Sequence, residues 1–169
     1  MRGRPEQRRH DAAQRPCEMG HRAPAPPASC QNARVKSAPN PLPSACPCGS
    51  GRAYPACCGR WHDGPGLLRA PDAESLMRSR YSAFVLDLLD YLRQTWHPDT
   101  RPADLSPNPP NLKWLGLQVR RHEKQDDDHA IVEFVARCRQ DGRASRLHET
   151  SRFVRQDGRW LYVDGDQHT

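Results

Sequence analysis

The stretch AIVEFVARCRQDGRASRLHETSRFVRQDGRWLYVD, residues 130–164, decides the fold class. Apolar and β-branched residues recur along it, and the tetrapeptide Gln-Asp-Gly-Arg interrupts them at 140–143 and again at 156–159. An Asp-Gly pair suits a type I′ hairpin turn, because both central residues of that turn need positive φ. The stretch therefore predicts three strands joined by tight turns, at 130–139, 144–155 and 159–164.

A fourth strand is predicted just before this stretch, at 112–122, with Asp126-Asp127-Asp128 marking the turn that follows it. Residues 72–96 have the helical pattern, with apolar side chains mostly three and four positions apart. Asp72 is a plausible N-cap for this segment, and either one long helix or two helices with a break near Asp87 fits the pattern. Helices followed by antiparallel strands predict an α+β fold, with the helices covering one face of the sheet.

A short cysteine-rich module precedes the helical segment, with the pattern C-x-C-x8-C-C. Two close pairs of thiolates separated by a tight turn can supply the four tetrahedral ligands of a zinc ion, and Gly49 and Gly51 permit the turn. We expect the glycine amides to donate to the sulfurs and Tyr54 to pack over the site. The alternatives are free thiols, a disulfide between the adjacent cysteines, or a redox pair. The predicted zinc ligands are Cys46, Cys48, Cys57 and Cys58.

The first 44 residues differ in composition from the rest. They hold eight of the 17 prolines and carry +5 of the net charge of +6, so the basic pI of 9.2 is mainly a property of this segment. Such a segment predicts a disordered tail, and the near-neutral remainder does not favour nucleic-acid binding by the folded part. A second metal site is conceivable there, although the spacing matches no known pattern, at His10, Cys17, His21 and Cys30.

No apolar run is long enough to cross a membrane, and no apolar stretch follows the basic N-terminus as it does in a secretory signal. The sequence therefore predicts a cytoplasmic protein, in which cysteines are more often metal ligands than disulfide partners. The predicted organisation is a tail (1–44), a zinc module (45–60), a Gly/Pro linker (61–71) and one α+β domain (72–166).

Two resemblances extend this reading. The string Cys46 to Gly59 resembles the SEC-C motif, in its spacing, its Gly-Ser-Gly and its tyrosine. Residues 45–166 resemble the bacterial YchJ family, through strings such as LMRSRYSA at 76–83, TWHP at 95–98 and DGRW at 157–160. This resemblance implies a cone-shaped domain similar to the nuclear-transport-factor, SnoaL and ketosteroid-isomerase superfold, and implies no particular reaction.

Three candidate catalytic residues stand out in the α+β domain. Glu149 shares a strand face with Leu147 and Phe153, where burial would raise its pKa and suit proton transfer; a buried acid paired with an arginine, or an acid at an open edge, is the alternative. His97 follows the helical segment and could enter a pocket or complement the helix dipole, and Tyr81 could assist. We expect Arg78 or Arg80 to form an ion pair with Glu133 or Glu149, and His148 to lie on the solvent face.

These features support two main hypotheses. The first is an adaptor, in which the zinc module docks a protein or ribosomal partner. The second is a small-molecule-binding protein or an enzyme of the isomerase, dehydratase or hydrolase type, which would use a pocket of the cone-shaped domain. Thiol redox chemistry at Cys57 and Cys58 is a third hypothesis, and tight metal binding would argue against it. The sequence contains no Gly-rich phosphate loop and no nucleophile elbow.

Overall fold

The computed structural model describes residues 43–168. The fold is α+β, as the sequence predicts, with the helices preceding a single four-stranded sheet of order β1-β2-β3-β4 in which all neighbours are antiparallel. The helices are α1 (Gly59–His62), α2 (Ala73–Val85) and α3 (Leu89–Gln94), with short 3-10 turns at Tyr54–Ala56 and Gly64–Gly66. The strands are β1 (Lys113–Lys124), β2 (His129–Gln140), β3 (Arg143–Gln156) and β4 (Arg159–Gln167).

Both Asp-Gly pairs form the predicted hairpin turns. Asp141 and Gly142 have φ values of 48° and 82°, and Asp157 and Gly158 have 50° and 73°. Two successive positive φ values are the mark of a type I′ turn, whose twist matches that of the flanking strands. The turns fix the register of β2 with β3 and of β3 with β4, and so decide which side chains face the core.

The helical segment is divided in two, which is the second of the two patterns that the sequence allows. Asp72 caps α2, because its carboxylate accepts a 2.7 Å hydrogen bond from the amide of Ser75. The chain leaves the helical conformation at Leu86, and Asp87 adopts a positive φ of 55° before α3 begins. The break lets α3 turn away from α2 while both helices cover the same sheet face.

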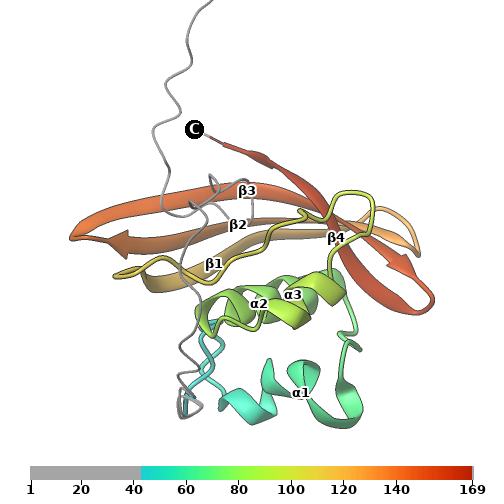
Figure 1. Ribbon diagram of the computed structural model, residues 1–169. Helices are drawn as coiled ribbons and strands as arrows, with labels where there is room; N and C mark the ends of the chain where they lie inside the picture. The colour runs from blue at the N-terminus through green and yellow to red at the C-terminus, as the bar shows by residue number, and fades with distance from the viewer. Residues whose placement is uncertain (1–42, 169) are drawn as a thin grey trace, which may run out of the picture.

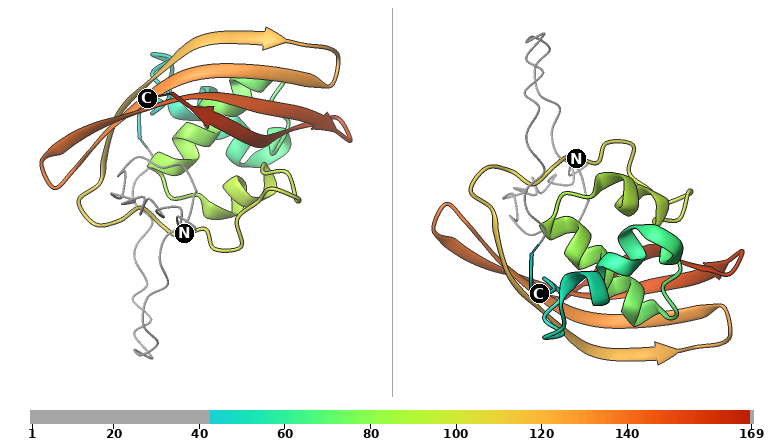
Figure 2. Two further views of the ribbon diagram at one scale, coloured as in Figure 1. Left: turned by 90° about the horizontal axis from the view of Figure 1, so that it is seen from above. Right: turned by 90° about the horizontal axis from the view of Figure 1, so that it is seen from below.

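The molecule is built in layers (Figure 1). The curved sheet is one layer, α2 and α3 cover one of its faces, and α1 lies on the far side of these helices. The cysteine turn lies beside α2 and comes close to β1, where a Cβ atom on Gly49 would be 3.7 Å from the Leu117 carbonyl oxygen. Figure 2 shows the sheet from its uncovered side and the helices from below. The main core lies between the sheet and the helices, with Phe134 and Phe153 of the sheet against Leu76 and Tyr81 of α2. Full burial of each such side chain stabilises the fold by roughly 1.5–3 kcal/mol.

The segment 61–71 is more structured than a Gly/Pro linker. The last two residues of α1, Trp61 and His62, belong to it, and Trp61 and Leu68 pack against the main core. The predicted tail (1–44) lies outside the described residues except for residues 43 and 44, and the second metal site predicted in it lies wholly outside them. Within the described part, no helix is long and apolar enough to cross a membrane.

Candidate metal centre

The four sulfur atoms of Cys46, Cys48, Cys57 and Cys58 converge on one point. All four lie within 4.8 Å of one another, and the Cys48 and Cys57 sulfurs are 3.7 Å apart. Thiolates bound tetrahedrally at about 2.3 Å from one cation would lie ~3.8 Å from each other. All four side chains are buried. The arrangement therefore fits a single soft cation held in a closed site.

Local backbone geometry explains this convergence. Gly49 and Gly51 have φ values of 76° and 74°, which side chains other than glycine rarely allow. The turn is closed by a hydrogen bond from the Cys46 amide to the Arg52 carbonyl and by a bridge between Ala45 and Ala53. These contacts close the turn that carries the first pair of cysteines, and the second pair follows the 3-10 turn at Tyr54–Ala56.

The thiols of Cys48 and Cys58 have pKa values shifted in opposite directions. A hydrogen bond from the Cys58 thiol, followed by one from Ser50, holds the pKa of Cys48 at about 4, against the opposing effect of burial. The same hydrogen bond to Cys48, together with burial, raises the pKa of Cys58 well above its usual range. Close sulfurs cannot all be ionised by themselves, so a metal ion that binds all four must displace protons.

The amide donors to the sulfurs are not those that the sequence led us to expect. Burial raises the pKa of Cys46, and hydrogen bonds from the amides of Cys48 and Cys58 partly offset that effect. The Gly49 amide donates to the Cys46 carbonyl instead. The glycines therefore shape the turn, whereas the cysteine amides stabilise negative charge on sulfur.

Helix α2 contributes polar contacts to the cysteines. The Ser82 hydroxyl lies 3.7 Å from the Cys46 sulfur, and Arg78 donates a 3.3 Å hydrogen bond to the carbonyl of Cys48. Ser50, from the module itself, lies 3.1 Å from the Cys57 sulfur. Leu86, just beyond α2, packs against the cluster that the four cysteines form with Tyr54. The module is thus completed by residues of the α+β domain.

His62 joins the module to the helical layer and was missed in the sequence, where it lies in the presumed linker. Its Nε2 is 2.9 Å from the Ser79 carbonyl, which can only accept, so Nε2 carries the proton. Nδ1 then accepts a 2.7 Å hydrogen bond from the Tyr54 hydroxyl. The ring also packs edge-on against Tyr91 at 4.4 Å, and Tyr91 in turn lies 2.7 Å from the Ser79 hydroxyl. Burial lowers the pKa of His62, which favours this neutral form.

Glu149 lies on the core face of β3, as the alternation of the sequence predicts. It is 3% exposed, and its Oε1 accepts hydrogen bonds from the Ser151 hydroxyl at 2.7 Å and the Tyr162 hydroxyl at 3.1 Å. A Cβ atom placed on Gly165 would lie 2.3 Å from this oxygen. The carboxylate is therefore enclosed by β3 and β4.

The predicted ion pairs with Glu133 and Glu149 are wrong. Arg78 pairs with Glu74 one turn earlier, and Glu133 pairs with His148 on the outer face of the sheet. Arg80 is buried and lies between the rings of Trp96 and Tyr162 at 4.8 and 4.7 Å. It donates to the Leu92 carbonyl and to Thr95, and burial lowers its pKa to about 10. Packing and hydrogen bonds to neutral groups, rather than a carboxylate, hold this guanidinium.

The other two catalytic candidates make contacts different from those of Glu149, whose carboxylate accepts hydrogen bonds from Ser151 and Tyr162. Tyr81 is buried and packs edge-on against Trp114 at 5.5 Å. His97 lies beyond the end of α3, and its ring contacts the Asp99 amide and Gln156, not the last turn of the helix.

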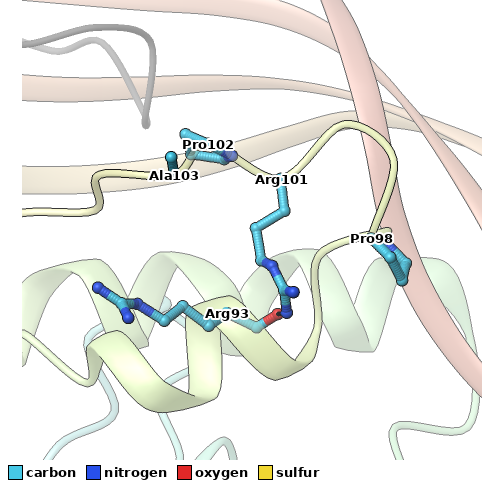
Figure 3. Close-up of a pocket in the computed structure, with 5 residues that line it drawn as sticks. All are labelled: Arg93, Pro98, Arg101, Pro102 and Ala103. Carbon is cyan, nitrogen blue, oxygen red and sulfur yellow. Dashed lines mark hydrogen bonds between the residues drawn. The ribbon is translucent and has the colours of Figure 1, made fainter.

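A shallow groove of about 390 Å³ lies on the loop after α3 and is lined by none of these three candidates. Figure 3 shows its lining residues, with the Arg101 guanidinium turned towards the Arg93 carbonyl and that of Arg93 pointing away. The two cations do not converge on a common ligand. The lining residues are Arg93, Pro98, Arg101, Pro102 and Ala103.

Comparison with known proteins gives the family. The model described as "YchJ, middle NTF2-like domain" matches residues 72–165. A UPF0225 protein of Bordetella parapertussis is 70% identical over 128 residues, which cover 76% of this chain and 96% of that protein. The chain belongs to the YchJ family. A UPF0225 protein of Cupriavidus pinatubonensis is 56% identical over 134 residues, covering 76% of this chain and 92% of the relative.

Two solved structures share the fold and the cysteine motif. One is a solution structure of a SEC-C motif containing protein from Rhodopseudomonas palustris, with 33% identity, a TM-score of 0.61 and coverage of 74% of this chain and 99% of that one. The other is a crystal structure of a SEC-C motif containing protein from Psychrobacter arcticus, with 30% identity, a TM-score of 0.60 and coverage of 76% and 85%. This chain likewise has a cluster of four cysteines next to its NTF2-like domain.

Proposed function

We propose that the cysteine module holds one structural zinc ion and that the protein is an adaptor whose module docks a protein partner. One observation carries the proposal: the four sulfurs are buried and face each other, while Arg52, Pro55 and Ala56 of the same short module are exposed. A closed four-thiolate site leaves no open coordination position for catalysis and is typical of structural zinc. The metal would fix the shape of a surface that remains available for binding.

Zinc is the metal that the ligand set favours. Tetrahedral thiolate sites select zinc or iron–sulfur clusters over hard cations such as magnesium, and four single sulfurs around one point suit a mononuclear ion. The module buries little apolar surface besides Tyr54 and Leu86, so metal binding would supply much of its folding free energy.

The interior of the NTF2-like domain favours an adaptor over an enzyme. Glu149 is enclosed between Ser151, Tyr162 and the backbone of Gly165. The groove next to Arg93 and Arg101 contains no residue of the acid–base type. A domain whose polar interior is used for its own packing is better suited to serve as a rigid support for the module.

Native mass spectrometry of the full chain, purified without chelator, tests the metal. We expect one zinc per chain, with the loss of protons that thiolate binding requires. Cys57→Ser should abolish stoichiometric binding. A metal-free chain with Cys57 joined to Cys58 would contradict the proposal and favour redox chemistry.

The adaptor role requires a variant that keeps the metal and changes only the surface. Arg52→Glu with Ala56→Glu alters two exposed side chains, neither of which is one of the four proposed ligands. We expect the cross-links between the wild-type chain and its partner, identified by mass spectrometry, to be absent for this variant. The control, Arg155→Glu with Arg159→Glu on the distant β3–β4 hairpin, should retain it. Identical cross-links for both variants would rule out docking through the module.

A further inference from the structure

The outer face of the sheet carries a cluster of cations that have no carboxylate partner. Lys113 of β1 lies directly opposite Arg139 of β2, and Arg137 of β2 lies directly opposite Arg146 of β3. All four side chains are exposed, and no ion pair involves any of them within the described part of the chain. We call these four residues the basic corner; it lies near the β2–β3 turn on the side shown in the left panel of Figure 2.

This arrangement is unusual for a sheet that merely faces water. Like charges placed directly opposite each other on neighbouring strands destabilise a sheet, and here two such pairs lie side by side. Elsewhere on the same sheet, Arg121 pairs with Glu123 and Arg152 pairs with both Asp164 and Asp166. The nearest acid in the following turn, Asp141, accepts a hydrogen bond from Asn111. The basic corner thus has a positive potential that no ion pair among residues 43–168 neutralises.

An exposed apolar side chain accompanies these cations. Leu115 lies at a bulge in β1, next to Gly116, which pairs with Arg137. It is 50% exposed, more than any other large apolar side chain of the described residues. A leucine next to cations offers an apolar contact in addition to charge, a combination found where protein partners dock.

We propose that the basic corner and Leu115 bind an extended acidic segment of a partner protein that also carries an apolar side chain. Alternate residues of an extended chain project on one side about 7 Å apart, which matches the separation of Arg137 and Arg139 along β2. The proposed surface is on the sheet and includes none of the exposed residues Arg52, Pro55 and Ala56 of the cysteine module.

The side chains of this face argue against nucleic acid. Proteins that bind single strands combine cations with aromatic rings on which bases stack. In the described strands, the rings of Trp114, Phe134, Phe153, Trp160 and Tyr162 all belong to the core or pack against it. The outer face therefore offers charge and a leucine, with no Phe, Trp or Tyr ring for a base.

A binding assay with the full chain tests the proposal. The probe is a fluorescein-labelled peptide with glutamate at alternate positions and a leucine between two of them, and fluorescence anisotropy gives the dissociation constant. Arg137→Glu with Arg146→Glu should weaken binding by about tenfold or more. This variant keeps a like-charged cross-strand pair, so we expect the fold to persist, as circular dichroism would verify. The matched control, Arg155→Glu with Arg159→Glu, has the same net charge and should change affinity by less than about twofold.

A substitution of Leu115 distinguishes a protein partner with an apolar side chain from a polyanion that binds by charge alone. Leu115→Ser should weaken binding of the leucine peptide by about threefold and leave a peptide with serine in place of leucine unaffected. Equal losses for the two charge variants, or no binding of the peptide, would overturn the proposal. Tighter binding of single- or double-stranded RNA than of the peptide, insensitive to Leu115→Ser, would also overturn it in favour of a nucleic-acid surface.

Discussion

The Tyr54 hydroxyl and His62 Nδ1 are 2.7 Å apart, and this hydrogen bond links the cysteine module to the helices beneath it. We predict that Tyr54→Phe lowers the free energy of unfolding by about 1–3 kcal/mol, because it leaves a largely buried ring nitrogen without a donor. His62→Ala should cost more, since it also removes the hydrogen bond to Ser79 and the packing against Tyr91. Urea denaturation of each variant and of the wild type measures both effects.

The control for these substitutions is His129→Ala. His129 is an exposed histidine at the start of β2, where a surface change is expected to stay within about 0.5 kcal/mol. If His62→Ala were as mild as His129→Ala, the module would not depend on this link.

Acid should weaken the same link. Burial lowers the pKa of His62 below its ordinary 6.5, so the folded chain binds fewer protons there than the unfolded chain. The neutral His62 side chain makes its full contribution to the free energy of unfolding above pH 6.5. This contribution is lost as the pH falls through the folded-state pKa, by at most ~1.4 kcal/mol per pH unit. We expect stability measured from pH 7.5 to 5 to fall less steeply for His62→Gln than for the wild type. Parallel curves would show that His62 does not titrate on unfolding.

Removal of the metal should loosen the module before the domain. With a strong chelator, we expect hydrogen exchange to rise at residues 45–62, because the small cluster around Tyr54 has little apolar surface of its own. Amides in the paired centre of β2 and β3 should remain protected, since the main core does not include the cysteines of the module. Exchange that rises equally in β2 would indicate a single cooperative unit.

The metal affinity itself should rise with pH. All four sulfurs must be ionised in the bound state; Cys48, with a pKa of about 4, already is at neutral pH, whereas the pKa of Cys58 is raised by its hydrogen bond to Cys48 and by burial. Titration with a chromophoric chelator at several pH values should show affinity increasing from pH 6 to 8, with more than one proton released per metal ion. Affinity that is independent of pH would mean that the thiols are already ionised.

Gly165 should not tolerate a side chain. A Cβ atom there would lie 2.3 Å from Glu149 Oε1, and the buried carboxylate has little room to move. We predict that Gly165→Ala lowers the free energy of unfolding by about 1–3 kcal/mol. In a double-mutant cycle, Glu149→Ala should remove most of the additional cost of Gly165→Ala. Additive effects of the two substitutions would show that the clash is relieved elsewhere.

Local chemistry explains what the sequence could predict. Asp141-Gly142 and Asp157-Gly158 set their turns through their own backbone preferences, and Asp72 caps α2 with an atom three residues from its partner. The cysteine pattern that predicts a metal site likewise spans only 13 residues. Each of these features depends on neighbours along the chain.

The features that were missed depend on contacts between distant segments. His62 gains its role from Ser79 and Tyr91, which lie 17 and 29 positions further on, and nothing in its local sequence marks it. The pairing of Arg80 was predicted wrongly for the same reason. The sequence shows an arginine on an apolar helix, but it does not show that Trp96 and Tyr162 enclose the guanidinium.

Helix α2 serves two layers at once, with Leu76 and Tyr81 towards the sheet and Ser82 towards the Cys46 sulfur. This has a consequence for biogenesis. Synthesis proceeds from the N-terminus, so a nascent chain exposes its four module cysteines before Ser79, Ser82 and Leu86 have been made. The complete enclosure of the thiols arises only after α2 has formed, and the thiols of a stalled or truncated chain would stay open to oxidation.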